Sequence, residues 1–580
     1  MKYDYDVIIV GSGVAGAICA WKLSTLGDYR ILILEAGDNG IGEGQRLEFH
    51  HAMDRRGNRG DMFAPYMELD TRAFAPSPEN ATKPLPKPGE VSDEKYFDYT
   101  PASQDTFRAG YNRLVGGSTW AWRGNCPRFL PVDFKMQTTY GKGRDWPISY
   151  DDLEKFYCEA ERELGVSGNH TELDGLFGAY RSHEFPMPGL PLTYSDTLIK
   201  PLINRKKLNG TTIRVTTTPQ ARNSQAYDGR PACEGHSNCI PLCPIHAKYD
   251  ATVHLRRALK NPGVTLKSAA VVTQVSANKQ GQITRVHFKD WRGDRTKDHI
   301  VSAPVVVLAA HAIETPKILL MSKVANSSDQ VGRNLSDHIQ WEVAAKFPQS
   351  VYPFRGPQSI TAIESFRDGK FRKDRSGFRM TIGNDGWGRA GSPAKVIDDL
   401  ISKDKGAYGP HLLAKAAAEV TRMIRLSFST EMLPRSENRV ELSSNKDPLG
   451  LPRPMFTFAP DDYCIGGLKV GFDTSIQLFG MMGIKDADIE KKGVVDPVSG
   501  KLINWNTAAH IMGTCIMGSD PADSVVDQWC RTHDHDNLFI VGSSVFASAA
   551  TANPTLTLAA LTLRASQAIH RQLKKGGHTA

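Results

Sequence analysis

A glycine-rich turn between two short apolar segments near the N-terminus constrains the fold of this chain most strongly. Residues 6–10 read Asp-Val-Ile-Ile-Val, and a G-x-G-x-x-G pattern follows at residues 11–16. Residues 17–26 have the spacing of an amphipathic helix, and residues 30–34, Arg-Ile-Leu-Ile-Leu, predict a second buried strand. This order of strand, glycine turn, helix and strand predicts the βαβ unit of a dinucleotide-binding fold.

Each glycine of the pattern has its own physical reason. Gly11 permits the tight turn, Gly13 lets the backbone approach a pyrophosphate, and Gly16 lets helix and strand pack closely. The N-terminus of the helix offers free N–H groups and a partial positive charge to phosphates. Glu35 follows the second strand, where an acid can bond both ribose hydroxyls. The pattern does not distinguish NAD from FAD, but Glu35 argues against NADP because it would repel a 2′-phosphate.

Composition excludes several other classes of protein. Hydrophobic residues make up 40% and charged residues 23% of the 580 residues, as in globular proteins. The formal net charge of +8 comes from 71 basic and 63 acidic residues, which is too even a balance to indicate a nucleic-acid partner. The best candidate for a membrane span, residues 301–321, is interrupted by charged side chains, and residues 1–10 lack a signal-peptide pattern. We therefore expect no membrane span and a cytoplasmic chain, or a periplasmic one if a partner subunit carries it there.

Further segments along the chain point to the cofactor. They are residues 113–119 (Arg-Leu-Val-Gly-Gly-Ser-Thr), 305–316, 331–338, 510–514 (His-Ile-Met-Gly-Thr) and 553–557 (Asn-Pro-Thr-Leu-Thr). In this order, and together with the N-terminal fingerprint, they resemble the glucose–methanol–choline (GMC) family of FAD oxidoreductases over nearly the whole chain. The resemblance implies an α/β fold, in which a Rossmann-like FAD-binding domain is joined to a discontinuous sheet-and-helix substrate domain.

A narrower resemblance rests on residues 139–145, 219–224 and 523–527. These segments are similar to the large catalytic subunits of bacterial sugar and polyol dehydrogenases, the group of the fructose, sorbitol and FAD-dependent glucose dehydrogenases. The resemblance implies that a secondary or anomeric hydroxyl of a sugar, glycoside or polyol is oxidised and that electrons pass to an external acceptor. It also implies a small companion subunit and a cytochrome c acceptor.

The family architecture implies how the chain is divided between domains. The FAD-binding domain would gather residues 1–45, 106–130, 213–345 and 500–575. The substrate-binding domain would comprise residues 146–212 and 346–499. Residues 46–105 are rich in proline, glycine and charge, and we expect a long loop or lid there.

Oxidation of an alcohol by a flavin requires a base for the hydroxyl proton and a path for hydride to flavin N5. A histidine suits the first task because its pKa lies near neutral pH. His510 matches the catalytic histidine of the family. Asn553 occupies the family's second catalytic position, where an amide can hold the substrate oxygen by hydrogen bonding. The alternatives are a packed core histidine and, because Pro554 follows, a helix cap at Asn553.

The resemblance also implies a set of contacts to FAD. Val272 could equally be a core strand residue. His311 stands where many relatives have glycine. Trp120 and Trp122 could either stack on a sugar or pack against the core. Relatives that tether FAD do so through a histidine near position 121, which here is alanine, so we expect noncovalent FAD. The expected cofactor-binding residues are Gly11, Gly13, Gly16, Glu35, Gly116, Gly117, Ser118, Thr119, Val272, Gly542, Ser543, Asn553 and Thr555.

Three of the nine cysteines, Cys233, Cys239 and Cys243, are closely spaced and precede Pro244. This spacing resembles iron–sulfur ligation, and the sugar dehydrogenases carry a 3Fe-4S cluster at this place. They commonly show an adjacent Cys-Cys pair, whereas this chain has glutamate at position 234. Zinc with His236 or His246 as fourth ligand, or thiols without metal, are the alternatives. The other six cysteines have no such spacing, and we expect them to be core thiols.

Two other reactions are known on the same scaffold. An oxidase would reduce O₂ directly, and the cysteine cluster argues against it. A hydroxynitrile lyase would carry out no redox chemistry, and the dehydrogenase-like segments argue against that. A disulfide reductase is disfavoured because no cysteine lies between Cys19 and Cys126.

Overall fold

The structure is a computed structural model of the chain. It describes residues 3–37, 97–101, 103, 107, 110–235, 239, 242–291, 294, 297–384, 397, 400–402, 407–447, 449–490 and 505–575. Most of the expected lid at residues 46–105 lies outside the described residues.

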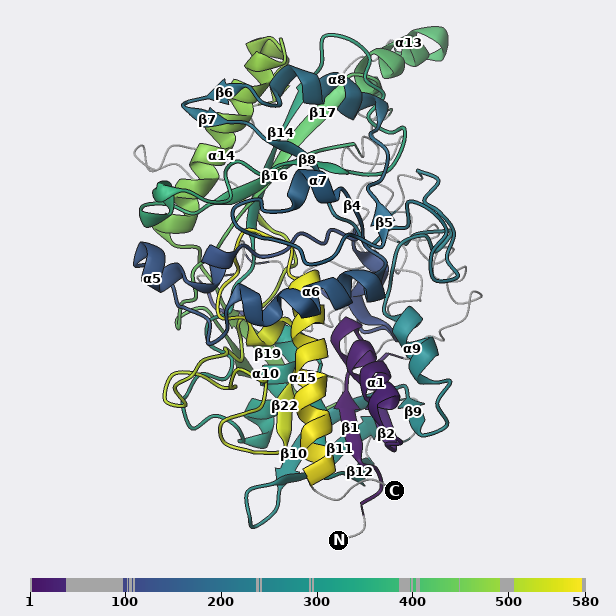
Figure 1. Ribbon diagram of the computed structural model, residues 1–580, viewed down its shortest axis with the longest axis vertical. Helices are drawn as coiled ribbons and strands as arrows, with labels where there is room; N and C mark the ends of the chain where they lie inside the picture. The colour runs from purple at the N-terminus through teal and green to yellow at the C-terminus, as the bar shows by residue number, and fades with distance from the viewer. Residues whose placement is uncertain are drawn as a thin grey trace.

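The predicted βαβ unit lies at the centre of a parallel sheet (Figure 1). Helix α1 (Val14–Leu26) connects its first two strands. The three central strands are buried along their whole length, as expected for a parallel sheet that is covered on both faces. In spatial order, the described strands are β22 (Leu538–Ile540), β13 (Val305–Leu308), β1 (Val7–Val10), β2 (Ile31–Leu34) and β9 (Val264–Lys267).

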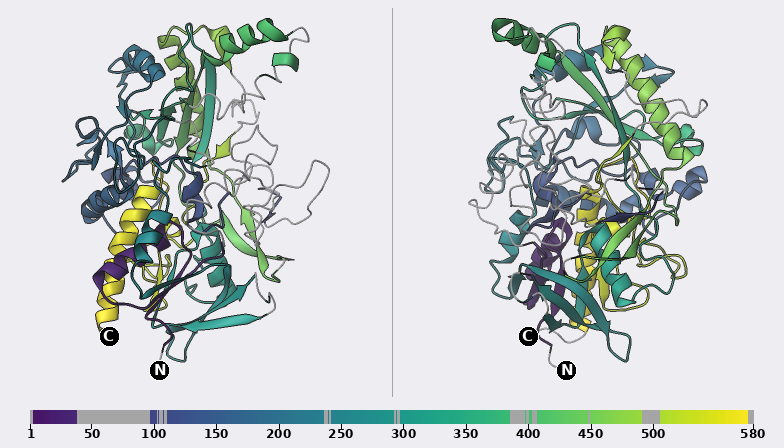
Figure 2. Two further views of the ribbon diagram at one scale, coloured as in Figure 1. Left: turned by 90° about the vertical axis from the view of Figure 1, so that its right-hand side faces the viewer. Right: turned by 180° about the vertical axis from the view of Figure 1, so that it is seen from behind.

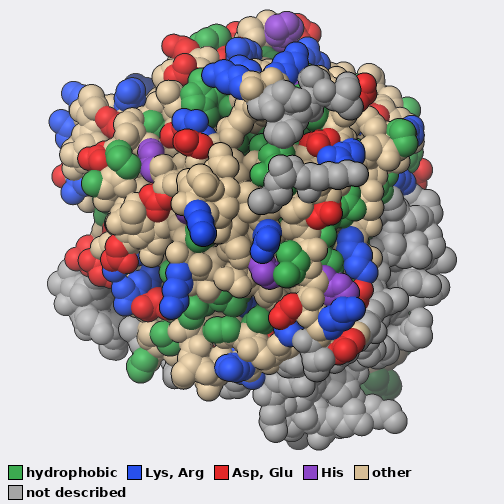
Figure 3. All heavy atoms as spheres, turned by 90° about the horizontal axis from the view of Figure 1, so that it is seen from below, with side chains coloured by type: hydrophobic (Ala, Val, Ile, Leu, Met, Phe, Trp, Pro, Cys, Tyr) green, Lys and Arg blue, Asp and Glu red, His purple; other side chains and the backbone are tan. Residues whose placement is uncertain are grey.

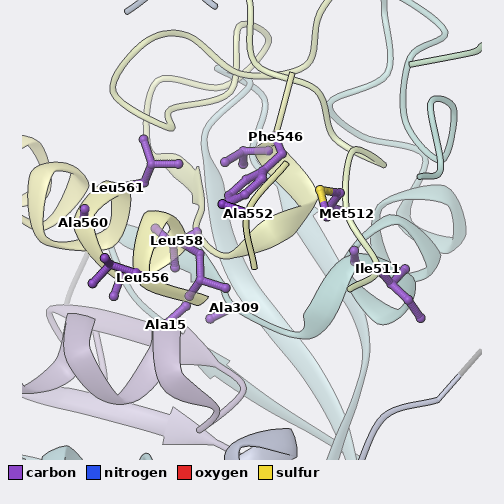
Figure 4. Packing of buried hydrophobic residues seen from close by; sticks show 14 of the residues in the cluster. Ala15, Ala309, Ile511, Met512, Phe546, Ala552, Leu556, Leu558, Ala560 and Leu561 are labelled. Carbon is purple, nitrogen blue, oxygen red and sulfur yellow. The ribbon is translucent and has the colours of Figure 1, made fainter. Parts of the chain in front are cut away.

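The C-terminal helix ties the first and last parts of the chain together. Helix α15 (Thr555–Lys575) packs against α1 and against α6 (Tyr150–Leu164). Helices α15 and α1 lie side by side in Figures 1 and 2. Figure 4 shows how small residues permit this packing: Ala15 of α1 and Ala309 beyond β13 lie next to the first turn of α15. The ends of three elements therefore meet beside the glycine turn.

A second, largely antiparallel sheet occupies the other half of the molecule (Figures 1 and 2). Helix α14 (Asp462–Met481) packs on its central strands, and a Cβ added at Gly471 of this helix would lie 2.5 Å from the Phe428 ring. The described strands, in order, are β20 (Ile489–Glu490), β14 (Ile339–Lys346), β17 (Met423–Thr430), β16 (Phe378–Ile382), β15 (Thr361–Ile363) and β8 (Val215–Thr217), with β21 (Asn506–Thr507) also paired to β14.

Smaller elements complete the described fold. One antiparallel sheet consists of β10 (Ala270–Ala277), β11 (Ile283–Asp290) and β12 (Asp298–Ser302), and α10 (His311–Ser322) packs on β10. Another consists of β18 (Arg439–Lys446), β19 (Pro452–Thr457) and β3 (Asp98–Tyr99). The remaining helices and strands are α5 (Met136–Tyr140), α7 (His170–Leu173), α8 (Tyr194–Ile203), α9 (Thr252–Ala258), α13 (Gly409–Val420), β4 (Ser167–Gly168), β5 (Met187–Pro188), β6 (Lys207–Leu208) and β7 (Thr211–Thr212).

The sheets do not follow the expected domain ranges at every strand. Strands β8 and β21 fall within ranges assigned to the FAD-binding domain, yet both pair within the second sheet. Strand β18 falls within the substrate range but packs on α10, and Lys317 and Asp447 form a buried ion pair of 3.6 Å beside this contact. The domain ranges themselves stay a prediction.

The described helices contain none that is both long and apolar enough to cross a bilayer. On the face shown in Figure 3, basic and acidic side chains are interspersed. This mixture on that face agrees with the even charge balance of the sequence.

Candidate active site

A cavity of about 550 Å³ lies between the two sheets, with residues of both in its walls. One wall comes from the glycine turn, the loop at 110–125 and the end of β13. The opposite wall comes from β14, β16 and β17, and the loop at 506–511 closes the space between them. The N-terminus of α15 also borders this cavity, so the predicted site residues from distant parts of the sequence converge here.

The fingerprint glycines differ in what surrounds them. Gly11 has φ of +99°, and an added Cβ would lie 2.6 Å from the carbonyl oxygen of Ala309. A Cβ added at Gly16 would lie 1.9 Å from the carbonyl oxygen of Gly11, so helix and strand touch there. At Gly13 no described atom lies within 4 Å of that position, Gly13 borders the cavity, and no side chain caps α1. The residues therefore leave open the space that a pyrophosphate requires at a helix N-terminus.

Glu35 is buried at the cavity wall and is held by three hydrogen bonds. Its Oε2 accepts from the N–H group (2.7 Å) and the hydroxyl (2.6 Å) of Ser12, and its Oε1 accepts from the Gly37 N–H (2.6 Å). Burial raises the pKa of Glu35, and these hydrogen bonds oppose the rise. The Ser12 hydroxyl also accepts from the Gly116 N–H at 3.1 Å, which fastens the fingerprint to the next loop.

The loop at Gly116–Thr119 borders the cavity with three of its four residues. Gly117, Ser118 and Thr119 line the cavity. Gly116, with φ of +96°, instead packs against the indole of Trp120, so its part is to shape the loop.

The two neighbouring tryptophans have different surroundings. Trp120 is 1% exposed and donates its indole N–H to the Val115 carbonyl at 3.0 Å. Trp122 lines the cavity and donates to the Tyr249 carbonyl at 2.8 Å. Of the two, only Trp122 is placed to meet a ligand.

The remaining predicted cofactor residues all border the cavity; they are Val272, Gly542, Ser543, Asn553 and Thr555. Val272 is also buried in β10, so both interpretations of this residue apply. The Ser543 hydroxyl donates to the Ile511 carbonyl at 2.7 Å, which joins the turn after β22 to the loop that carries His510.

A polar cluster at the same cavity was not predicted from the sequence. Arg113 forms an ion pair with Glu314 at 2.8 Å, and the Tyr111 hydroxyl donates to the same carboxylate. The Tyr111 ring stacks on His311 with centroids 4.6 Å apart. Burial lowers the pKa of His311 to about 4, so this imidazole is neutral. His311 has φ of +70°, a conformation that favours glycine. The histidine at a position where many relatives have glycine was the one signal in the sequence that pointed to this cluster.

His510 and Asn553, the predicted catalytic pair, lie together at the cavity. The Asn553 amide nitrogen is 3.1 Å from Nε2 of His510. This hydrogen bond joins the side chains of the predicted pair. The geometry fits the predicted pair, and the catalytic roles of both residues stay a prediction.

His338 and Asp337 contact His510 from the opposite side, and sequence reasoning gave neither a role. Nδ1 of His338 lies 3.0 Å from Nδ1 of His510. Asp337 Oδ1 accepts from the N–H groups of His338 (2.6 Å), Ala508 (3.2 Å) and His510 (2.9 Å). The only signal in the sequence was that both residues stand at the end of the landmark segment 331–338.

Burial dominates the electrostatics of this group. It lowers the pKa of His510 well below the ordinary histidine value, with His338 adding to the effect, and it lowers the pKa of His338 to about 4. It raises the pKa of Asp337 to about 7 against the opposing backbone hydrogen bonds. Both imidazoles are therefore neutral near pH 7, the state in which a histidine can accept a proton.

Hydroxyl, amide and guanidinium groups cover the wall that the second sheet presents to the cavity. Arg379 and Thr381 alternate along β16, and they pair in register with Ser429 and Ser427 of β17. Because side chains two residues apart point to the same face of a strand, these four lie together on one face. Gln340 of β14, opposite Ser429, extends the same face. This surface can form hydrogen bonds with several hydroxyl groups at once.

Cys233, Cys239 and Cys243 are free thiols, and Lys248 links the Cys239 carbonyl to the carbonyl of Trp122, which lines the cavity. Cys239 and Cys243 are buried. The pKa of the Cys233 thiol is raised, chiefly by burial, and the nearby thiols of Cys239 and Cys243 add to the rise. Arg222, itself buried, donates to Sγ of Cys239 at 3.2 Å. Thiols close to a buried cation are suited to hold an anionic metal–sulfur centre.

Among the described residues, Cys233, Cys239 and Cys243 do not form a group whose three ligand atoms all lie within 4.8 Å of one another. The 3Fe-4S cluster at these cysteines therefore stays a prediction. Two histidines were the candidates for a fourth ligand to zinc. His236 lies outside the described residues, and Nε2 of His246 lies 3.4 Å from Asp250.

The six other cysteines are buried thiols, as predicted; they are Cys19, Cys126, Cys158, Cys464, Cys515 and Cys530.

The fold and the cavity define a dinucleotide-binding protein of the Rossmann-like class, with a histidine–asparagine pair and a polar sheet face lining the same cavity. Models of the GMC oxidoreductase family match residues 206–340 and 434–562, and a model of the NAD(P)-binding Rossmann-like domain matches residues 9–46. The chain belongs to the GMC oxidoreductase family. It is an FAD oxidoreductase that acts on CH–OH groups, so the predicted family, fold class and enzyme class are confirmed.

Individual relatives narrow this picture. The chain is 33% identical to the fructose dehydrogenase large subunit of Gluconobacter japonicus, with 98% of each chain covered. It is 28% identical to the 6'''-hydroxyparomomycin C oxidase of Streptomyces lividus, covering 98% of this chain and 92% of that one. The crystal structure of pyridoxine 4-oxidase from Mesorbium loti has the same fold, with a TM-score of 0.60 at 18% identity, and 98% and 99% of the two chains covered.

Proposed function

We propose that the protein is an FAD-dependent dehydrogenase that oxidises a secondary or anomeric hydroxyl of a sugar, glycoside or polyol and passes the electrons to an external acceptor. The observation that carries this proposal is the contact of 3.1 Å between Asn553 and Nε2 of His510, at a cavity between the nucleotide-binding turn and a polar sheet face.

In this proposal the two residues share the reacting hydroxyl. Its oxygen takes a hydrogen bond from the Asn553 amide, and its proton passes to Nε2 of His510. When bound, the flavin supplies the acceptor for the hydride that leaves the same carbon. Burial of His510 supports its role as the base, because its low pKa keeps the ring neutral before the reaction.

The polar sheet face supports a substrate with several hydroxyl groups. Arg379 is held by Glu364 at 2.8 Å and by Thr218 at 2.7 Å, and this fixes the guanidinium at the cavity wall. Fixed donors and acceptors select a polyhydroxylated ligand, because an apolar one would leave them without partners. The relation to a fructose dehydrogenase subunit points to the same class of substrate.

The segment that carries Cys233, Cys239 and Cys243, here called the thiol loop, supports the proposal of an iron–sulfur relay. Cys233, Cys239 and Cys243 would hold a 3Fe-4S cluster, which supplies one-electron redox chemistry when bound. Lys248 donates to the carbonyl oxygens of Trp122 (2.6 Å) and Cys239 (2.7 Å), so it fastens this loop to the wall of the cofactor cavity. The proposal includes noncovalent FAD, a small companion subunit, and a cytochrome c as acceptor.

The proposed location is cytoplasmic for the chain alone and periplasmic if a partner subunit exports it. Fractionation of the native host, with antibodies against this chain, tests the location. Detection only in the cytoplasm would exclude the exported form.

The function is tested with a panel of glucose, glucosides, fructose, sorbitol and inositols. Anaerobic mixing with a true substrate should bleach the flavin, and turnover should require an artificial acceptor. Because a relative is an oxidase, oxygen consumption is the rival outcome: rapid turnover with O₂ alone would make the protein an oxidase of the same fold. A flavin that no member of the panel bleaches would contradict the proposed substrate class, and would leave open non-redox chemistry such as that of a hydroxynitrile lyase.

A further inference from the structure

His510 contacts a second histidine on the side of its ring that faces away from Asn553. His338 is 1% exposed and lies directly before β14. Its Nδ1 is 3.0 Å from Nδ1 of His510, and its Nε2 is 3.1 Å from the carbonyl oxygen of Ala550. Every ring nitrogen of the two histidines therefore has a defined neighbour.

These neighbours determine where the ring protons lie. A carbonyl oxygen can only accept, so Nε2 of His338 carries the proton and donates to Ala550. A neutral imidazole has one N–H group, which leaves Nδ1 of His338 as an acceptor. Nδ1 of His510 must then donate to it, and Nε2 of His510 keeps its lone pair.

We propose that His338 is a positioning residue, which holds His510 in the Nδ1–H tautomer and so keeps Nε2 free to take the proton of the substrate hydroxyl. This inference rests on the proposed role of His510 as the base. Without an acceptor at this position, the His510 ring could carry its proton on Nε2, the nitrogen that faces Asn553, and such a ring cannot accept a proton there.

The arrangement also suits the state after proton transfer. Once Nε2 of His510 is protonated, its Nδ1–H group continues to donate to His338, and a hydrogen bond from a charged donor is stronger than one from a neutral donor. Burial keeps the pKa of His338 at about 4, so His338 stays an acceptor at neutral pH. Asp337 holds the two backbones by accepting from the N–H groups of both histidines.

Two substitutions separate the acceptor from the rest of the side chain. His338→Leu fills much of the space but removes both ring nitrogens. His338→Asn also loses the bond to Ala550 but places an amide oxygen near the position of Nδ1, where it can accept from His510. The two variants therefore differ chiefly in the acceptor that His510 requires.

The rate of flavin reduction by substrate, measured anaerobically by stopped flow, is the readout. We expect His338→Leu to retain FAD and bind substrate, yet to lose about 10²–10⁴-fold in this rate, the range for loss of acid–base catalysis. His338→Asn should recover at least tenfold of that loss. Equal losses in both variants, or a loss under threefold in His338→Leu, would overturn the inference.

A double variant distinguishes this inference from the proposed base itself. If His338 acts through His510, then His338→Leu should cause little further loss in a His510→Ala background, since coupled residues are not additive. A further tenfold loss there would show that His338 acts independently. If His510→Ala alone reduces its flavin at the wild-type rate, the proposed base is wrong, whatever the two His338 variants do.

Discussion

At the level of single residues, the proposed reaction depends on Nε2 of His510 and the amide of Asn553, which are 3.1 Å apart. His510→Ala should retain FAD but lose about 10²–10⁴-fold in the rate of flavin reduction, because the hydroxyl proton has no base to receive it. Asn553→Ala should slow the same half-reaction. Exposed His183 offers a control, since His183→Ala should behave as the wild type. A tenfold loss or less in His510→Ala would assign the proton transfer to another residue.

The pH dependence of this step follows from the burial of His510. Burial favours the neutral ring and lowers its pKa, so the base form persists at pH values where an exposed histidine is already protonated. The rate of flavin reduction should therefore stay level as the pH falls from neutral, and should decline only below the ordinary histidine pKa of about 6.5. Stopped-flow rates measured between about pH 4.5 and about pH 8, on both sides of that value, test this. A decline that is centred at or above that pKa would contradict the assignment.

At the level of elements, the strand–turn–helix unit separates two effects of glycine. In Gly16→Ala the new Cβ meets the Gly11 carbonyl at 1.9 Å, so the apoprotein should lose about 1–3 kcal/mol of stability, as overpacked sites do. In Gly13→Ala the new Cβ meets no described atom, so apoprotein stability should stay unchanged while the Kd for FAD rises. Thermal melting of the apoproteins and FAD titration measure the two effects. Wild-type FAD affinity in Gly13→Ala would mean that the pyrophosphate does not approach this turn.

The thiol loop is the second element whose composition can be tested directly. If Cys233, Cys239 and Cys243 hold a 3Fe-4S cluster, the purified protein should contain about three iron atoms per chain and give an EPR signal when oxidised. Cys239→Ser should lower the iron content. Cys464→Ser is the matched control, because this buried thiol lies in α14 and its contact with Thr430 (3.1 Å) is one that a hydroxyl can keep. Iron-free wild-type protein from anaerobic purification would contradict the cluster.

Local patterns and long-range contacts differed in how well the sequence revealed them. The βαβ unit was predictable because its strands, glycines and helix are adjacent in the sequence and each residue type has a local reason. The contact between His338 and His510 joins residues 172 positions apart. The polar sheet face depends on the register between β16 and β17, which no short segment encodes. Residues such as Arg379 therefore required the structure, whereas His510 and Asn553 were found because their motifs could be matched.

At the level of the whole molecule, the wall of the cavity and the thiol loop are directly joined. Trp122 lines the cavity, and Lys248 links its carbonyl group to that of Cys239, so the thiol loop and the cofactor wall are fastened by one buried side chain. In the proposed function, substrate oxidation uses the cavity alone, whereas electron export uses the thiol loop as well. The two half-reactions should consequently respond to different substitutions.

Cys239→Ser should therefore reduce its flavin with substrate at the wild-type rate, yet pass electrons to cytochrome c more slowly by at least about tenfold, because the proposed relay would be incomplete. Cys464→Ser should match the wild type in both half-reactions. Anaerobic double mixing, with substrate first and cytochrome c second, separates the two rates. If Cys239→Ser transfers electrons to cytochrome c as fast as the wild type, the thiol loop is not the route, and a flavin that reacts directly with its acceptor becomes the better description of the molecule.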